Sequence, residues 1–408
     1  MTRVRDVEDE SDAVVPTSDA RTADVVAADV VVNPGPAVTR DTRVGSDRAQ
    51  QPAGSPTLGR RSLLTAAAVA LPVAGSAAVA TVAARPADAS TLFAGPHPAG
   101  ITDPPLPFVV IAGFDLLTPH RAELAELLRI WNALGARLSS TERTVTIGFG
   151  PALFERTPLG LGPDRPAALK VLPAFAGEAL DRVGSNGDLG VQICASSPAA
   201  ASRAMRSLVT AARPLAGMRW RQVGYREQDG TSDPRGPFDF RDGTANLDVT
   251  DPVATARHLW VNDGPQWLHG GSYLVVRRIR LIVDTWDRTG LADQEALIGR
   301  TRHTNQRTGG GHAQLARPET NGGATLLRRS YSYDAGVDAN GLQDTGLIFI
   351  AFQQDPGRQF VPVQQRLAGH DQLNAFSQHT ASAVFACPAG PTAQSWLDGH
   401  LTTTTEST

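Results

Sequence analysis

The order of apolar patterns between residues 108 and 227 constrains the fold more than any other feature of this sequence. Short apolar runs that are typical of buried strands alternate with helical patterns. Strands are expected at 108–117, 144–154, 188–196 and 220–227, and helices at 121–138 and 198–213. The order strand, helix, strand, strand, helix, strand is that of a ferredoxin-like unit.

The second half of the chain repeats this pattern. Strands are expected at 272–286, 346–354 and 382–390, and helices at 291–300, 360–369 and 371–380. The first of these strands alternates apolar residues with arginines, so one of its faces should be exposed to solvent or should face a ligand. We therefore expect two related α+β domains side by side, with their sheets facing across a shared core.

The first 89 residues are not expected to belong to this fold. Residues 1–59 are polar and lack periodicity, which predicts disorder. Arg60 and Arg61 then precede an apolar run at 63–84, and Ala87-Asp88-Ala89 is typical of a cleavage site. This pattern predicts a twin-arginine export signal and an extracellular or cell-envelope location, with a membrane anchor as the alternative. Because this route exports folded proteins, often with a cofactor inserted, it favours a cofactor-binding protein.

These patterns divide the chain into four parts, namely 1–89 (extension and signal), 90–227 (N-terminal domain), 228–396 (C-terminal domain) and 397–408 (loose tail). The net charge of −3 and pI of about 6.3 provide no basic surface of the kind that binds nucleic acid. The two cysteines, Cys194 and Cys387, lie in apolar segments without metal-site spacing, so we expect buried free thiols.

Asp242 lies in the polar stretch "GPFDFRDGTANLDVTDP". Asp-Gly is a common turn, and Asp242, Asn246, Asp248 and Asp251 could be oxygen ligands of calcium, although their spacing does not match an EF-hand. The local sequence therefore leaves a turn, a calcium loop and a functional acid open.

Two further segments carry candidate residues. His312 follows three glycines, which let the backbone approach another group closely. The sequence contains no HExxH motif and no pair of histidines at helical spacing, so it does not predict a zinc site. Arg328 and Arg329 are neighbours in a strand pattern, so at most one of them can point into a given pocket.

The motifs taken together resemble the dye-decolourising peroxidases, in particular their exported twin-arginine group, which includes deferrochelatase/peroxidase. Matching segments run in the family's order from 95–102 to 382–390 and include "FRDGTANL", "GGSYLVVRRIRLIVDTWDR" and "LLRRSYSYD". The resemblance implies two ferredoxin-like domains of the dimeric α+β barrel type, with one haem b in the C-terminal domain. It also implies a haem peroxidase that reduces hydrogen peroxide and oxidises dyes, phenols or other organic substrates.

The resemblance assigns the catalytic side of the haem. Asp242 matches the acid of the family's G-x-x-D-G motif and is expected to be the distal acid–base. Arg328, the first arginine of its pair, is expected to stabilise charge on the same side, and Asn246 matches an asparagine that lines it. A carboxylate acid–base predicts an acidic pH optimum, with a rate that falls again once the carboxyl is protonated.

The same resemblance assigns the cofactor contacts. His312 matches the proximal histidine that binds the iron, and Gly243, Thr244 and Arg328 are expected to contact the haem. Four positions depart from the family's pattern, namely Asp239 in place of the first glycine of G-x-x-D-G, Gln314, Arg317 and Glu319. The last three lie close to His312 in the sequence, where they could change the redox potential or haem affinity.

Three functional alternatives stay open beside the peroxidase. They are release of iron from haem for an iron-uptake permease system, a haem carrier whose catalysis has decayed, and an empty structural relative. A homo-oligomer is compatible with all of them. Tyr331, Tyr333 or Trp396 could relay electrons from bulky dyes, or be packed aromatic residues.

Overall fold

In the computed structural model, which describes residues 93–227 and 234–390, the first half of the chain has the predicted order of strands and helices. Its elements are β1 (Phe108–Leu116), α2 (Arg121–Leu138), β2 (Arg143–Phe149), α3 (Pro151–Glu155), the 3-10 turns η1 (Thr157–Leu159) and η2 (Gly162–Asp164), β3 (Leu189–Ala195), α4 (Pro198–Ala212) and β4 (Ala216–Tyr225). The antiparallel strand order β2-β3-β1-β4 confirms the ferredoxin-like unit.

The second half contributes the remaining elements. They are α5 (Pro252–His258), η3 (Gln266–Leu268), β5 (Ser272–Leu281), α6 (Val283–Asp287), α7 (Leu291–Ile298), α8 (Gly311–Leu315), η4 (Pro318–Thr320), β6 (Leu327–Arg328), β7 (Tyr331–Val337), β8 (Gln343–Gln353), α9 (Phe360–His370), η5 (Gln372–Phe376) and β9 (Ser377–Cys387). All described residues belong to one contact unit, residues 80–408.

Several predicted boundaries were wrong. The helix expected at 371–380 is the short 3-10 turn η5 followed by the start of β9, because residues from Ser377 onward pair with β5. The strand expected at 272–286 ends at Leu281 and gives way to α6. The strand expected at 144–154 ends at Phe149, since Pro151 begins α3.

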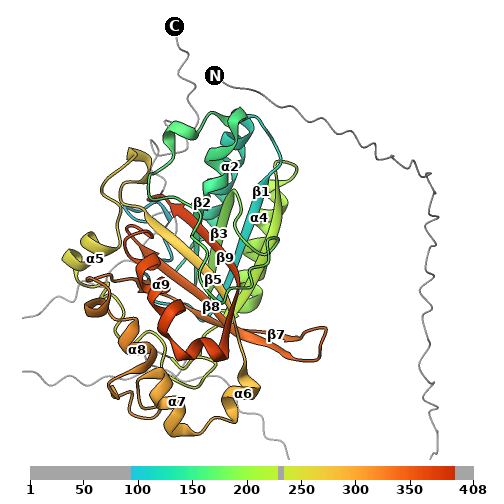
Figure 1. The fold of residues 1–408 in the computed structure, drawn as a ribbon. Coiled ribbons are helices and arrows are strands. Elements are labelled where there is room, and N and C mark those ends of the chain that lie inside the picture. Colours follow the sequence, from blue (N-terminus) through green and yellow to red (C-terminus); the bar gives the residue numbers. More distant parts are fainter. Residues whose placement is uncertain (1–92, 228–233, 391–408) are drawn as a thin grey trace, which may run out of the picture. The chain divides into compact units, whose positions relative to one another are not determined.

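The strands of the two halves join into a closed ring (Figure 1). They follow the order β5-β9-β2-β3-β1-β4-β7-β8, and β8 pairs with β5 again. The two junctions between the halves are narrow, with one residue pair between β2 and β9 (Phe149 and Ala386) and one between β4 and β7 (Tyr225 and Ser332). The ring confirms the predicted pair of facing sheets and explains why both faces of most strands are buried.

Strand β1 illustrates the two sides of the ring. Val109 and Ile111 belong to the inner cluster, which contains side chains from both halves, whereas Val110 and Ala112 belong to the outer cluster with α2 and α4. This alternation follows from the two-residue period of a strand. The inner cluster is therefore the shared core that the sequence predicted.

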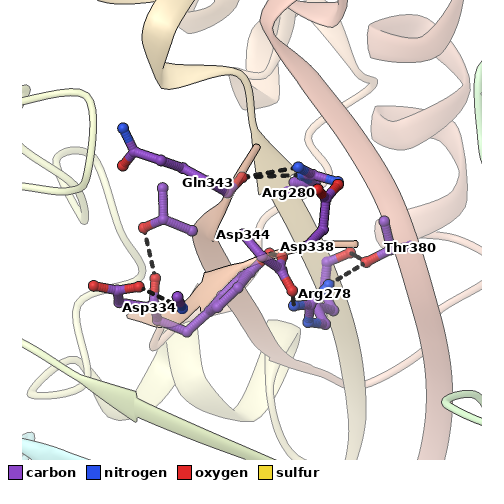
Figure 2. A network of polar contacts seen from close by, with 10 residues as sticks. Arg278, Arg280, Asp334, Asp338, Gln343, Asp344 and Thr380 are labelled. Carbon is purple, nitrogen blue, oxygen red and sulfur yellow. Dashed lines mark hydrogen bonds and ion pairs between the residues drawn. The ribbon is translucent and has the colours of Figure 1, made fainter. Parts of the chain in front are cut away.

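The arginines of β5 are held by ion pairs around the β7–β8 hairpin (Figure 2). The guanidinium of Arg278 donates two 2.7 Å hydrogen bonds to Asp344, and that of Arg280 lies 2.8 Å from the carboxylate of Asp338. Arg277, on the other face of the strand, is buried and pairs with Glu178. Arg277, Arg278 and Arg280 of β5 therefore each form an ion pair with a carboxylate.

The remaining expectations about the chain fall into two groups. Cys194 and Cys387 are buried free thiols, as predicted. The extension and signal at 1–89, the tail at 397–408 and Trp396 lie outside the described residues. Among the helices that the structure describes, none is both long enough and apolar enough to cross a membrane.

Candidate active site

The loop that carries Asp242 is anchored by aromatic packing. Phe238 and Phe240 are buried, and their rings lie 4.2 and 6.0 Å from that of Trp286 on α6. Backbone hydrogen bonds close the loop, among them Gly236 N–H to the carbonyl of Phe240 (2.9 Å). Asp242 follows this anchor directly, and its side chain keeps 32% exposure.

Asp239 stands in the same loop with a backbone φ of 62°. This left-handed conformation favours glycine, which is the residue of the family motif at this position. The Asp239 carboxylate lies 3.5 Å from the guanidinium of Arg235 and 3.8 Å from that of Arg302. Asp239 therefore adopts the backbone turn that glycine would adopt at this position, and its carboxylate adds ion pairs at the surface.

Asp242 and Arg328 lie beside each other although they come from different segments. The Arg328 guanidinium is 3.8 Å from the Asp242 carboxylate and donates a 2.8 Å hydrogen bond to the carbonyl of Thr244. The amide of Asn246 donates to the Arg328 carbonyl (2.7 Å) and accepts from the Arg328 N–H (2.8 Å). Asn246 thus acts as a positioning residue that ties the Asp242 loop to β6.

The neighbouring Arg329 points the other way. It is almost fully buried, and its guanidinium donates to the carbonyls of Ile101 (2.8 Å) and Asp103 (2.6 Å). The strand alternation expected from the sequence therefore places only Arg328 beside Asp242.

A small cavity lies next to this pair. It has a volume of about 20 Å³ and is lined in part by Asp242, Gly243, Arg328 and Ser330. A volume of this size admits a water-sized molecule. Asp242 and Arg328 can therefore contact a small polar ligand, whereas a bulky dye does not fit.

His312 is held by a buried carboxylate. Its Nδ1 lies 2.6 Å from Asp371 at the start of η5, and the side chains of His312 and Asp371 are 34% and 4% exposed. An ionised carboxylate only accepts hydrogen bonds, so Nδ1 is the donor and Nε2 carries the free lone pair. This arrangement is typical of a histidine that binds a metal through its other nitrogen.

The glycines before His312 allow α8 to pack closely against α7. Gly311 has a φ of 62°, and a Cβ at this position would lie 2.4 Å from the carbonyl oxygens of Ala296 and Leu297 on α7. The backbone approach that the glycine run predicted is therefore an approach to α7, and it sets the position of α8.

The departures near His312 lie on the segment that follows it. The Arg317 guanidinium is 3.7 Å from the carboxylate of Glu319, which is largely exposed. The carbonyl of Gln314 accepts a 2.8 Å hydrogen bond from the hydroxyl of Thr320. Both contacts are made with residues of the η4 turn and not with His312.

The structure thus brings the candidate residues together in two groups. Asp242, Gly243, Thr244, Asn246 and Arg328 form the first, through the contacts between the loop and β6. His312 belongs to the second, in which α8 packs against α7, α9 and η5. Asp371 was missed because the sequence placed it in a helix, and its only local signal was that of a capping residue.

The donor set of the two groups fits haem. His312, whose Nδ1 is held by a buried carboxylate, could supply through Nε2 the single imidazole ligand that haem iron requires from the protein. The acid and the guanidinium would supply polar groups for a small molecule bound to that iron.

The calcium alternative is not supported. Within the described residues, no group of three or more His, Cys, Asp or Glu side chains is arranged to hold a metal ion. Asp248 accepts hydrogen bonds from Thr250, and Asp251 caps α5 by accepting from the N–H groups of Val253 and Ala254. Both acids have local structural roles.

The tyrosines considered as electron relays are buried. Tyr331 belongs to the inner cluster, where its hydroxyl donates to the carbonyl of Leu106 (2.9 Å). Tyr333 also belongs to this cluster, and its hydroxyl donates to Asp344 (3.2 Å). Burial raises the pKa of both phenols. Both rings are packed aromatic residues, and neither reaches the surface.

Two family models match the chain in succession. The model described as "Dyp-type peroxidase, N-terminal" matches residues 98–226, and the one described as "Dyp-type peroxidase, C-terminal" matches residues 233–392. A dye-decolorizing peroxidase of Thermobifida fusca is 35% identical over 364 residues, which cover 76% of this chain and 83% of the relative. A deferrochelatase of Escherichia coli is 29% identical over 366 residues, covering 76% and 86%.

Solved structures of similar proteins agree with these matches. Ferric DtpA from Streptomyces lividans superposes with a TM-score of 0.71 at 35% identity and covers 76% of this chain and 97% of its own. A DyP-type peroxidase from Cellulomonas bogoriensis gives a TM-score of 0.70 at 36% identity, with coverages of 78% and 100%.

Proposed function

Because the chain belongs to the Dyp-type peroxidase family and is a haem-dependent peroxidase, we propose that Asp242 moves the protons of hydrogen peroxide and that His312 binds the haem iron. Arg328 stabilises negative charge beside Asp242, and Asn246 holds Arg328 in position. The observation that carries this proposal is the 3.8 Å contact between the Asp242 carboxylate and the Arg328 guanidinium.

When bound, haem supplies the iron centre that cleaves the oxygen–oxygen bond and accepts electrons from an organic reductant. Asp242 takes a proton from one peroxide oxygen and delivers it to the other, which requires that the carboxylate begin ionised. The carbonyl of Gly243 accepts a hydrogen bond from the N–H of Asn246, and the carbonyl of Thr244 accepts one from Arg328.

Replacement of Asp242 tests the proton transfer. The variant Asp242→Asn should keep its haem and react with peroxide about 10²- to 10⁴-fold more slowly, measured by stopped-flow absorbance of the haem. Asp248→Asn, an exposed acid of the same segment, is the matched control and should react like the wild type. Equal rates in both variants, or a flat rate from about pH 4 to 8, would remove Asp242 from the mechanism.

A second candidate function is the release of iron from haem. The similarity to the deferrochelatases of E. coli, at 29% identity and with 86% of the relative covered, favours it. Incubation of the haem-loaded protein with a reductant and a ferrous chelator should then yield chelated iron and, with two protons taken up in place of the metal, metal-free porphyrin. A supply of iron to an uptake permease would follow from that result, whereas intact haem after many turnovers would assign the protein to peroxidation alone.

We also propose that the protein is exported by the twin-arginine route. Arg60-Arg61, the apolar run at 63–84 and the Ala87-Asp88-Ala89 site support this location. Replacing both arginines with lysine should retain the full-length protein inside the cell, as judged by fractionation. Unchanged export of that variant would exclude the route.

A further inference from the structure

Helix α4 and strand β4 carry positive charge that no acid of the same segment balances. Residues 189–226, which form β3, α4 and β4, contain six arginines and no aspartate, glutamate or lysine. The whole chain, in contrast, has more acids than basic residues, 41 against 38. A segment with one sign of charge in a slightly acidic chain indicates a surface for a negatively charged partner.

Four of these arginines lie together on the outside of the ring. Arg203, Arg206 and Arg213 are spaced three and seven residues apart, which places them on the exposed side of α4. Arg221 lies on β4 beside this helix, because its guanidinium donates a 3.1 Å hydrogen bond to the hydroxyl of Ser202. Helix α4 itself covers the outside of the strands (Figure 1).

The charges of these four outer arginines are not neutralised by the protein. Of the other two arginines in the segment, Arg219 pairs with Asp115 (3.1 Å) and Arg226 lies over the ring of Tyr331. Within the described ranges, no carboxylate contacts the guanidinium groups of the four outer arginines. Their positive charge is therefore available to a partner.

Apolar side chains are exposed beside these arginines. Met218, Val223 and Tyr225 of β4 are 38%, 44% and 47% exposed. In the pairing of β4 with β1, Met218 lies opposite Phe114. Val223 lies opposite Val110, and both β1 residues belong to the outer cluster, so these side chains share the outer side of the ring. We call the three apolar side chains and the four outer arginines the α4–β4 face.

This mixture of charges and apolar groups fits the surface of an anionic membrane. Guanidinium groups attract anionic lipid headgroups, and exposed apolar side chains can enter the boundary between headgroups and acyl chains. A second copy of this face does not fit, because the arginines of two copies would repel each other. Duplex nucleic acid would match the charges but would leave the apolar side chains against phosphates.

We propose that the α4–β4 face binds the surface of an anionic lipid bilayer. Two exposed acids, Glu227 after β4 and Asp334 on the β7–β8 hairpin, mark the border of this contact. Tyr225 also lines the small cavity beside Asp242, so binding brings that cavity close to the lipid headgroups. The inference goes beyond the proposed function and depends neither on peroxide chemistry nor on the route of export.

Lipid vesicles test the proposal on the full-length, haem-loaded protein. Amide hydrogen exchange is followed at low ionic strength with vesicles that contain phosphatidylglycerol and with vesicles of phosphatidylcholine alone. The anionic vesicles should slow exchange in α4 and β4, and the neutral vesicles should not. The apolar run at 63–84 is present in every sample, so the readout is the difference between the two lipids within α4 and β4.

Three double variants separate the charges from the apolar side chains. Arg203→Gln with Arg206→Gln should raise the lipid concentration for half-maximal protection about 10- to 30-fold, at roughly fivefold for each arginine. The matched control, Arg257→Gln with Arg288→Gln, removes two exposed arginines from other elements and should behave like the wild type. Met218→Ser with Val223→Thr keeps every charge and should raise that concentration about 2- to 10-fold.

The outcomes decide between partners. Equal lipid requirements for the wild type and the variant at Arg203 and Arg206 would overturn the proposal, and so would slowed exchange that spares α4 and β4. If duplex DNA slows exchange there and anionic vesicles do not, the face binds nucleic acid and the membrane proposal is wrong. Without vesicles, all variants should react with peroxide like the wild type, so a wild type that lacks this reaction contradicts the proposed function alone.

Discussion

At the scale of single residues, Asp239 combines an unusual backbone conformation with a surface charge. Asp239→Gly and Asp239→Ala both remove the carboxylate that lies near Arg235 and Arg302. Only alanine keeps a Cβ at φ of 62°, so we expect the alanine variant to be less stable than the glycine variant by about 1 kcal/mol. Urea unfolding of the two proteins measures this difference. Equal stabilities would mean that the turn relaxes around the side chain.

His379 should limit stability in acid. Burial, with a further contribution from the positive charge of Arg277, lowers the pKa of His379 to about 3, compared with an ordinary value of 6.5. The unfolded chain therefore binds one more proton than the folded chain between these values, so stability falls as the pH drops through this window. The loss should amount to about 2 kcal/mol between pH 6.5 and 5.

The variant His379→Gln measures this effect. It removes the titrating group, so its unfolding free energy should fall less between pH 6.5 and 5 than that of the wild type. Comparison of the two proteins at pH 8 gives the packing cost of the substitution by itself. Identical acid dependence would assign the loss of stability to other groups. The acidic optimum expected for the Asp242 carboxylate is therefore opposed by falling stability at low pH.

At the scale of elements, the position of α8 depends on its contact with α7. Gly311 and Gly309 both have positive φ values, 62° and 86°, but only a Cβ at Gly311 would meet the carbonyls of α7. Gly309→Ala should therefore cost only backbone strain, about 1 kcal/mol. Gly311→Ala should cost about 1–3 kcal/mol more, because the helix must move.

The same pair of variants reports on haem binding. A displaced α8 moves His312 away from the carboxylate of Asp371, so Gly311→Ala should retain less haem than Gly309→Ala, as judged by the Soret absorbance per chain. Equal stability and equal haem content in the two variants would show that the close contact with α7 does not position the histidine.

Strands and helices whose apolar pattern is local were predicted well from the sequence. Helix α2, for example, has the predicted bounds 121–138 and buries Leu124, Leu127, Leu128 and Trp131. The segment 371–380 was mispredicted, because β9 continues through polar residues that only its pairing with β5 places in a strand. Helical and strand periods are ambiguous in such short polar stretches.

At the scale of the whole molecule, the ring makes the stability of one half depend on the other. Phe385 on β9 is fully buried, and the glycines Gly148 and Gly190 of the first half leave the space for its side chain. A Cβ at Gly190 would lie 2.8 Å from that ring. The inner core is therefore built from complementary large and small residues of both halves.

Truncation of Phe385 tests this coupling. Phe385→Ala should lower the unfolding free energy by about 3–5 kcal/mol, as expected for a large buried ring. Hydrogen exchange should accelerate in β2 and β3 as well as in β5 and β9, because all four strands border the lost side chain. Faster exchange confined to β5 and β9 would show that the halves are energetically independent.

The sequence by itself determined the order of most elements, the burial of both cysteines and the choice of Asp242, Arg328 and His312 as candidates. These features follow from local periodicity, from glycine patterns and from motifs in a fixed order. The tertiary structure decided the closure of the ring, the contact of Asp242 with Arg328, the use of Asn246 as a clamp and the pairing of His312 with Asp371. Asn246 and Arg328 are 82 positions apart, and His312 and Asp371 are 59 apart. Contacts over such separations form only when the whole chain has folded, so no local pattern encodes them.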